Sequence, residues 1–232
     1  MLLELEGVTS YYGKTPILQG IDLGVAEGSC IAVLGRNGVG KTTLMRTIMG
    51  LTTRMTGKLT IAGEDATHKA THERSAAGIG YIPQGRGILP KFTVRENILL
   101  GTFARHDQKR AIPDMCLDLF PYLAENLNTR AGQLSGGQQQ QLSIARALAT
   151  DPKILLMDEP TEGIQPNIVQ EIEATIKHLN QEVGLTVVLT EQHIKIAKKL
   201  AHEFVIMDRG RIEARGLISE LTDELINKHL MI

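Results

Sequence analysis

Apolar runs alternate with stretches of helical periodicity along most of the chain. Four of the runs predict strands, at residues 29–34, 153–157, 186–190 and 203–207. Strands that alternate with helices are typical of an α/β fold. We therefore expect a mostly parallel sheet covered by helices.

Shorter signals predict further elements. Residues 41–49 predict a helix that ends at Gly50, because glycine readily adopts the left-handed conformation that closes a helix. Residues 59–63 predict a β segment that pairs with the N-terminal strand in an antiparallel sheet. The last part of the chain, residues 217–230, predicts a terminal helix.

The middle of the chain has a mainly helical pattern. Thr93 and Glu96 form a capping-box pattern where it begins, and Pro113 and Pro121 interrupt it. No repeat or linker divides the chain. We therefore expect one domain with two parts: an α/β core at residues 1–87 and 150–232, and a helical subdomain inserted at residues 88–149.

Composition and charge narrow the class of protein. The 232 residues can bury a large core, and 42% hydrophobic with 22% charged residues is ordinary for a globular protein. The net charge of −1 argues against a nucleic-acid binder, which would carry a basic excess. No apolar run reaches the ~20 residues that cross a bilayer, and residues 1–6 lack the features of a signal peptide. We expect a cytosolic protein that reaches a membrane only through partners.

The cysteines and histidines do not indicate a metal or disulfide framework. Cys30 and Cys116 are too few for such a framework, and Cys30 lies in an apolar run that predicts a buried thiol. His68 and His72 are four residues apart, but no other ligand type lies near them in the sequence. A solvated polar face is the better interpretation of this pair.

A phosphate loop follows the first predicted strand. Gly35, Gly40, Lys41 and Thr42 occupy the fixed positions of the pattern Gly, four residues, Gly-Lys, then Ser or Thr. Such a loop, together with Gly38, brings backbone N–H groups against phosphate oxygens, and the next helix points its positive end at the same anion. Lys41 adds charge near the β- and γ-phosphates, and the Thr42 hydroxyl can ligate Mg²⁺. A chance match is the alternative, but the flanking strand and helix favour the loop.

Two acidic residues end the predicted strand at 153–157. Asp158 is expected to emerge at the sheet edge where α/β folds bind ligands, and it can hold Mg²⁺ directly or through water. Glu159 can orient or deprotonate an attacking water. Alone, this pair would more often be a helix cap or a surface turn. Together with the phosphate loop it indicates phosphoryl transfer.

A second candidate phosphate-binding element lies between the loop and the acidic pair. Ser135, Gly136 and Gly137 supply a hydroxyl and two flexible N–H groups at the start of a predicted helix. A capped helix with glycines at its start is the plain alternative. One nucleotide has little need of two such elements in one chain.

In this order, the loop, residues 134–138 and the acidic pair resemble the ATP-binding subunits of ABC transporters over nearly the whole chain. The resemblance implies an ABC ATPase fold, with a RecA-like phosphate-loop core, an N-terminal antiparallel β subdomain and an inserted helical subdomain. It implies ATP and Mg²⁺ as cofactors. In this family residues 134–138 are the signature, which serves the ATP of the opposite subunit in a head-to-tail dimer.

The resemblance assigns roles residue by residue. It gives nucleotide binding to Tyr12, Gly35, Asn37, Gly38, Gly40, Lys41, Thr42, Thr43, Gln84, Ser135, Gly136, Gly137 and Gln138, metal binding to Thr42, Gln84 and Asp158, and catalysis to Glu159, Lys41 and Gln192. Gln84 matches the glutamine that links the core to the helical subdomain, although alone it would be an ordinary loop residue. Tyr12 is similar to the aromatic that stacks on adenine; Tyr11 is the competing residue, and a core or surface tyrosine is the alternative.

Two positions depart from the family pattern. Gln165 stands where the family usually has an aspartate, after the catalytic glutamate. The family's switch histidine falls on Gln192, and His193 follows one residue late. Glutamine can hydrogen-bond the γ-phosphate but carries no charge. Either this subunit's own site hydrolyses slowly, or His193 substitutes.

Several segments resemble the ATPases of branched-chain amino-acid and urea uptake systems, among them residues 34–41, 83–86 and 191–192, while residues 160–166 and 135–141 favour the urea type. The resemblance implies a bacterial-type uptake system at the cytoplasmic face of the inner membrane. Its partners would be a second ATP-binding subunit, identical or different, two membrane permease subunits, and indirectly an extracytoplasmic solute-binding protein. Motion would pass to the permeases through Gln84 and residues 86–92.

Two other functions remain open from the sequence. An ABC-type ATPase acting on DNA or the ribosome would usually carry a coiled-coil insertion or two tandem cassettes, and this chain has neither. We expect no nucleic-acid partner. A nucleotide-dependent regulatory module with little turnover gains weight from Gln192.

Overall fold

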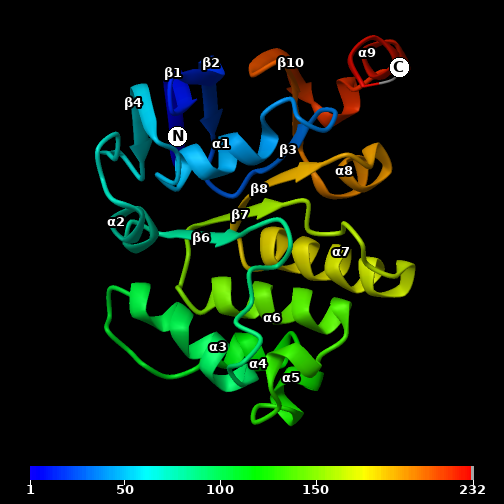
Figure 1. Ribbon diagram of the computed structural model, residues 1–232. Helices are drawn as coiled ribbons and strands as arrows, with labels where there is room; N and C mark the ends of the chain where they lie inside the picture. The colour runs from blue at the N-terminus through cyan, green and yellow to red at the C-terminus, as the bar shows by residue number, and fades with distance from the viewer. Residues whose placement is uncertain (231–232) are drawn as a thin grey trace.

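The computed structural model describes residues 1–230, which form two β-sheets with helices packed around them (Figure 1). The larger sheet has six strands in the order β10-β9-β3-β8-β7-β6. Its strands are β10 (Arg211–Leu217), β9 (Glu203–Asp208), β3 (Cys30–Leu34), β8 (Thr186–Glu191), β7 (Ile154–Asp158) and β6 (Ile79–Ile82). All neighbouring pairs are parallel except β10 with β9, so the predicted mostly parallel sheet is confirmed.

The central strands are buried on both faces of the sheet. Every residue of β3, β7 and β8 is buried. Successive side chains point to opposite faces, so Ile31 and Val33 join one hydrophobic cluster while Ala32 and Leu34 join the other. This two-sided burial explains why these strands are nearly continuous apolar runs in the sequence.

The smaller sheet is antiparallel and covers one face of the molecule's core. Its order is β2-β1-β4-β5, with β1 (Leu3–Tyr12), β2 (Thr15–Val25), β4 (Arg54–Ile61) and β5 (Glu64–Asp65). Helix α1 (Lys41–Ile48) shares one hydrophobic cluster with both sheets. The predicted antiparallel sheet near the N-terminus is confirmed, but β4 starts at Arg54 and ends at Ile61. The predicted end at residue 63 was wrong, because Ala62 and Gly63 both have positive φ and form a turn.

Helices cover the other face of the larger sheet. Figure 1 shows α7 next to this sheet and α3 to α6 beyond it. Besides α1, the helices of the described residues are α2 (Thr71–Ala76), α3 (Val94–Gly101), α4 (Asp114–Asp118), α5 (Pro121–Glu125), α6 (Gly136–Leu148), α7 (Pro166–Gln181), α8 (Ile194–Leu200) and α9 (Asp223–His229), with 3-10 turns at Thr102–Ala104, Ala131–Gln133 and Ile218–Glu220. No helix in the described part of the chain is long and apolar enough to cross a membrane. The predicted capping box is confirmed, since Thr93 Oγ1 accepts from the Glu96 N–H and Glu96 accepts from the Thr93 N–H.

The predicted terminal helix at residues 217–230 was wrong at its start. Leu217 is the last residue of β10, and α9 begins at Asp223, where the Thr222 hydroxyl accepts from the Leu225 N–H. Residues of β10 alternate between exposed and half-buried, and this polar edge strand has no apolar run that would reveal it. The division into a core and an inserted subdomain stays a prediction.

Candidate nucleotide-binding site

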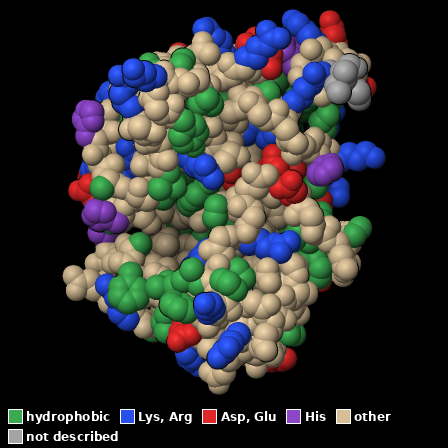
Figure 2. All heavy atoms as spheres, viewed as in Figure 1, with side chains coloured by type: hydrophobic (Ala, Val, Ile, Leu, Met, Phe, Trp, Pro, Cys, Tyr) green, Lys and Arg blue, Asp and Glu red, His purple; other side chains and the backbone are tan. Residues whose placement is uncertain are grey.

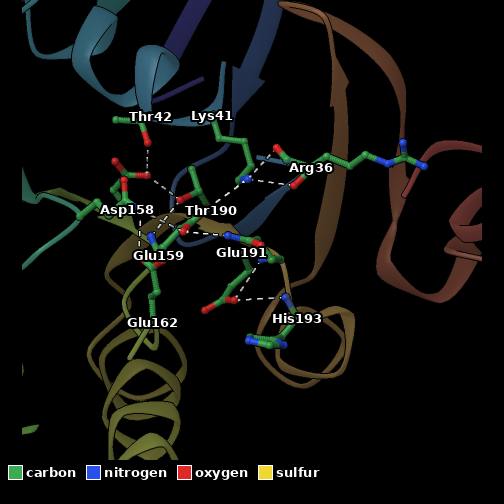
Figure 3. Close-up of polar contacts among 12 residues, drawn as sticks. Arg36, Lys41, Thr42, Asp158, Glu159, Glu162, Thr190, Glu191 and His193 are labelled. Atoms are coloured by element: carbon green, nitrogen blue, oxygen red, sulfur yellow. Dashed lines mark hydrogen bonds and ion pairs between the residues drawn. The ribbon is translucent and has the colours of Figure 1, made fainter. Parts of the chain in front are cut away.

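The candidate site lies where β3, β8, β7 and β6 end at one edge of the larger sheet. The strand register pairs Leu34 with Glu191 and Asp158 with Thr190. The loops that leave these strands therefore meet, as ligand-binding loops do at the carboxyl ends of parallel strands. Figure 3 shows Lys41, Thr42, Asp158 and Glu159 turned toward one another at this edge.

The phosphate loop needs glycine for two different reasons. A Cβ on Gly35 would lie 2.7 Å from the Met207 carbonyl oxygen, so the loop packs too closely on β9 for a side chain. Gly40, at the N-terminal end of α1, has φ 112°, which L-residues rarely adopt. No side chain caps α1, so its first N–H groups face the loop without a side-chain acceptor. The loop thus has the form of an anion cradle.

Lys41 is buried and holds the loop to the acidic strand end. Its Nζ donates to the carbonyl oxygens of Gly35 at 2.8 Å and Arg36 at 3.1 Å. It also forms an ion pair with Glu159 Oε1 at 3.1 Å, and both side chains are nearly inaccessible. The sequence predicted that these residues lie together, and the structure brings them together.

Asp158 presents one satisfied oxygen and one free oxygen. Its Oδ1 accepts from the hydroxyls of Thr42 at 3.2 Å and Thr190 at 2.8 Å. Its Oδ2 is buried and has no hydrogen-bond partner among the described residues. Burial raises the pKa of the Asp158 carboxyl, which the two hydroxyls only partly oppose. A cation on Oδ2 would satisfy the orphaned oxygen.

Glu159 is the point where contacts from three other segments converge. Besides Lys41, its carboxylate accepts from the side-chain amides of Gln84 at 3.3 Å and Gln192 at 3.0 Å. Its φ is 48°, in a region that costs a non-glycine residue about 1 kcal/mol or more. Its N–H donates to Thr190 Oγ1 at 2.9 Å, which helps to hold this turn. Strain of this kind is typical of functional sites.

Two further residues shape the site and were missed in the sequence. The Thr190 hydroxyl joins Asp158 to the backbone of Glu159. Glu191 is buried, accepts from the Thr161 hydroxyl at 2.7 Å, and has a pKa raised by burial. These contacts depend on strand register, for which no local sequence signal exists. The sequence offers one indirect hint: Thr190 and Glu191 are polar residues at the end of an otherwise apolar strand, where ligand sites of α/β folds lie.

Gln192 stands at the predicted switch position. Its amide reaches Glu159, whereas the backbone N–H of His193 donates to Glu191 at 3.4 Å. In Figure 3 His193 lies beyond Glu191, farther from Lys41. The geometry therefore brings Gln192, and not the side chain of His193, to the carboxylate of Glu159.

Two pockets adjoin Glu159. One, of about 240 Å³, is lined by Ile17, Asn37, Gly38, Gly40, Lys41, Thr42, Thr43, Gln84 and Glu159. The other, of about 230 Å³, is lined by Asn37, Glu159, Thr161, Glu162, Glu191, Gln192 and His193. Half of the predicted nucleotide-binding and metal-binding residues, those of the phosphate loop with Gln84, thus line the first cavity.

The two tyrosines lie outside these pockets and differ in their contacts. Arg54 stacks over the Tyr11 ring at 4.1 Å from its centre. The Tyr12 hydroxyl instead accepts from Arg46 at 3.5 Å, on the helix that follows the phosphate loop. Tyr12 is also the more exposed of the two. These contacts leave Tyr12 as the better placed candidate for stacking on a base.

The signature residues form a separate helix start. Ser135 Oγ accepts from the Gln138 N–H at 3.3 Å, and Gln138 Oε1 accepts from the Ser135 N–H at 2.8 Å. A Cβ on Gly137 would lie 2.6 Å from Ile168, so α6 and α7 meet there through glycine. Within the described chain, no hydrogen bond joins Ser135, Gly136, Gly137 or Gln138 to the phosphate loop. The structure therefore does not bring the two predicted phosphate-binding elements together in one chain.

Comparison with known proteins agrees with this site. Residues 18–162 match the family described as ABC transporter. The high-affinity branched-chain amino acid transport ATP-binding protein BraG of Pseudomonas aeruginosa is 38% identical over 212 residues, which cover 91% of this chain and 91% of that protein. The Nod factor export ATP-binding protein I of Rhizobium etli is 35% identical over 227 residues, 97% of this chain and 71% of that protein.

A solved structure gives the same result for the fold. The dimeric structure of an ATP-binding cassette in a post-hydrolysis state, bound to ADP and Pi, superposes with a TM-score of 0.81 at 28% identity. The match covers 93% of this chain and 98% of that one. The predicted ABC ATPase fold is therefore confirmed.

Proposed function

The chain belongs to the ABC transporter family, and we propose that it is the motor subunit of a system that imports a small polar solute. As a member of this family it is an ATPase. The assignment of each residue below is our proposal. The observation that carries it is the convergence of Lys41, Gln84 and Gln192 on Glu159.

Glu159 is proposed as the general base for hydrolysis. It directly follows the buried strand β7 beside the phosphate loop, and its carboxylate borders both pockets. A base must lie within hydrogen-bond reach of the water from which it takes a proton. Gln192 would orient Glu159 or the γ-phosphate, and Lys41 would exchange its loop carbonyl partners for phosphate oxygens when ATP binds.

The donor atoms fit Mg²⁺. Thr42, Asp158 and Gln84 offer hard oxygen ligands, and the orphaned Asp158 Oδ2 needs a partner. Mg²⁺ held there would neutralise negative charge on the β- and γ-phosphates. Thr190 keeps Asp158 oriented, since its hydroxyl donates to the other carboxylate oxygen.

We propose that a second ATP-binding subunit completes the site, as part of a head-to-tail dimer. The signature of one chain would then contact the ATP on the phosphate loop of the other. The separation of these elements in this chain supports that arrangement, and the similar cassette of known structure is dimeric. Whether the partner is a second copy or a different subunit is left to experiment.

Exposed apolar side chains support docking to membrane permeases. Leu89, Phe92, Leu100, Phe103 and Tyr122 are all at least 38% exposed. Figure 2 shows apolar side chains gathered on the lower part of the visible face, where Figure 1 draws α3 to α5. A patch of this kind on a soluble surface is typical of a protein interface. We propose that the permeases hold the chain at the cytoplasmic face of the membrane.

Import of a branched-chain amino acid or of urea is the finer proposal. The similarity to BraG along 91% of both chains supports amino-acid uptake, and the sequence at residues 160–166 and 135–141 favours urea. The test replaces the chromosomal gene with the Glu159→Gln variant and measures uptake of labelled leucine and labelled urea. We expect uptake of one solute to be lost. Normal uptake of both, with ATPase activity of the purified wild type intact, would contradict import of this class.

A low-turnover regulatory role is a second candidate. The contact between Gln192 and Glu159 favours it, since a neutral amide occupies the position of a charged switch. Turnover of the purified chain, alone and with a partner ATPase, separates the two functions. A motor subunit is expected to turn over faster with its partner, whereas a regulatory module would stay slow.

A further inference from the structure

The turn after β6 has an unusual backbone. Gly85, Arg86 and Gly87 have φ values of 77°, 72° and 59°, so three successive residues are left-handed. Glycine adopts this conformation freely, but arginine does so at a cost of about 1 kcal/mol. Such a residue persists where its surroundings hold it in place.

The side chain of Arg86 is held on the start of α6. Its Nη1 donates to Gln139 Oε1 at 3.1 Å, and the Gln139 amide donates in turn to the Leu134 carbonyl at 3.0 Å. A Cβ on Gly136 would lie 3.0 Å from Arg86 Nη2, so the guanidinium lies directly against the first residue of the helix. Arg86 thus contacts the start of α6 directly after Ser135, and Gln139 links it to Leu134 directly before Ser135.

The backbone of the turn is fastened to the same helix. The Arg86 carbonyl accepts from the Ser143 hydroxyl at 2.6 Å, and the Gly87 carbonyl accepts from Arg146 at 2.8 Å. These contacts lie one and two helical turns further along α6 than Gln139. The turn is therefore bonded to α6 along most of the helix.

The other end of the turn reaches the carboxylates of Glu159 and Glu162. Gln84 Nε2 donates to Glu162 at 2.8 Å and to Glu159 at 3.3 Å. Because carboxylates only accept hydrogen bonds, they fix the amide with its nitrogen toward them and leave its oxygen for a metal. Only one residue separates Gln84 from Arg86, so the two contact sets cannot move independently over more than a few ångströms.

We propose that Arg86 is a positioning residue that couples the two ATP sites which the chain serves. Its own nucleotide sets the position of Gln84, and Arg86 carries that position to the signature, which faces the partner's ATP. This inference rests on the proposed function. It adds that the side chain of Arg86, through Gln139 and Gly136, is the contact that carries the position of Gln84 to the start of α6.

The test substitutes the side chain without changing the backbone. Arg86→Gly keeps the turn, since glycine adopts a φ of 72° without strain. Arg209→Gly is the matched control, because Arg209 also has a positive φ, 44°, and its side chain is 92% exposed. Arg86→Lys retains one charged donor and lacks the planar fork.

Amide hydrogen exchange is followed in peptides covering residues 83–88 and 134–142, with and without Mg²⁺ and a non-hydrolysable ATP analogue. Protein concentrations are chosen at which light scattering reports monomers, so that dimer contacts do not contribute. In the wild type and in Arg209→Gly, the analogue should change exchange in both segments. In Arg86→Gly the change at 83–88 should remain, while that at 134–142 falls about tenfold. Arg86→Lys should be intermediate.

The melting temperature and the analogue's Kd should be unchanged in Arg86→Gly, which a merely structural role would not predict. ATP turnover should show a lower kcat with an unchanged KM. An analogue-dependent change at 134–142 that survives in Arg86→Gly, or is missing in the wild type, would overturn the coupling alone. A wild-type chain that binds no analogue would instead overturn the proposed function, and the coupling with it.

Discussion

The N-terminal ends of α1 and α6 look alike in sequence, because each begins at glycines, but they are completed in opposite ways. Gly40 starts α1 with no side-chain cap. At α6, Ser135 and Gln138 cap each other's backbone N–H groups. The backbone N–H groups at the start of α1 are therefore open to a bound anion. Those at the start of α6 are already hydrogen-bonded to side chains of the same helix start.

The surroundings of the two helix starts also differ. Around α1, Lys41 and Glu159 are buried and bonded to the loop and strand end. At α6, Ser135 is exposed, and the glycines after it serve close packing against Arg86 and Ile168. The comparison teaches that two helix starts of similar sequence differ in what they leave open: in the proposed dimer, the start of α1 would bind this chain's nucleotide, and the start of α6 would face the partner's.

The largest expected effect is on turnover, at the end of β7. Glu159→Gln removes the proposed base and should lower kcat by about 10²- to 10⁴-fold while ATP still binds. The measurement is phosphate release at saturating ATP. Glu182→Gln is the control, since that glutamate is largely exposed and pairs only with His178 in the described chain. Turnover of Glu159→Gln at the wild-type rate would contradict the role of Glu159.

A smaller effect is expected at the start of α6. Ser135→Ala removes a cap, which costs about 0.5–2 kcal/mol of stability, and it should lower turnover in the dimer about tenfold. Thr222→Ala is the matched control, because Thr222 caps α9 in the same way far from the site. The two variants should melt alike in calorimetry and differ in turnover. Equal turnover would mean that Ser135 is only a cap.

Gln192→His tests whether the switch limits the site near α1. A charged donor forms a hydrogen bond stronger by about 1 kcal/mol, which corresponds to about fivefold in rate. Because histidine is protonated mainly below pH ~6.5, the gain should be larger at pH 6 than at pH 8. His193→Gln serves as the control and should change little. A decrease in kcat for Gln192→His at both pH values would refute the weakened-switch account.

The smallest effect compares local opening of the two regions through their cysteines. Cys30 lies in β3 before the phosphate loop, and Cys116 donates to the Ala145 carbonyl of α6. Burial raises the pKa of each thiol to about 12, so both should react slowly with a thiol reagent at pH 8 and faster as the pH rises. We expect Cys116 to react a few-fold faster, since it lies on a five-residue helix rather than in a central strand. Mass spectrometry of the labelled peptides measures the ratio.

The same raised thiol pKa values set a pH dependence of stability. The unfolded chain ionises its thiols near the ordinary pKa of 9.0, whereas the folded chain keeps them neutral to about 12. Folding is therefore favoured below pH 9, and stability is lost as the pH rises between these values. Replacing Cys30 and Cys116 by alanine should remove this part of the slope in urea titrations.

The elements that could be predicted from the sequence are those with a local pattern. Strands β3, β7 and β8 are apolar because both faces are buried, and the phosphate loop has fixed glycines. Strands β2 and β10 were missed, since each is exposed at many positions and forms no apolar run. Each is an edge strand that is stabilised by pairing with the strand just before it, β1 for β2 and β9 for β10, and periodicity does not report such pairing.

The same limit applies to the site. The proximity of Lys41, Asp158 and Glu159 followed from motifs, and the structure confirms it. Thr190 was not assigned a role, and Arg86 was named only within residues 86–92, not as a contact of α6. Their contacts depend on strand register and on how the turn after β6 packs on α6. Sequence motifs identify residues whose own chemical group contacts the ligand. Positioning residues act by holding such residues in place, and no motif marks them.

The proposed difference between the starts of α1 and α6 is that only the first binds the chain's own ATP. The ATP affinity of the isolated chain tests this most directly. Lys41→Ala and Ser135→Ala are each titrated with ATP and Mg²⁺ by calorimetry, at concentrations where the protein is monomeric. Loss of a charged hydrogen-bond donor should weaken binding about 10- to 100-fold in Lys41→Ala. Ser135→Ala should bind ATP as the wild type does. If Ser135→Ala weakened binding as much as Lys41→Ala, both ends would serve one nucleotide in one chain, and the account would be wrong.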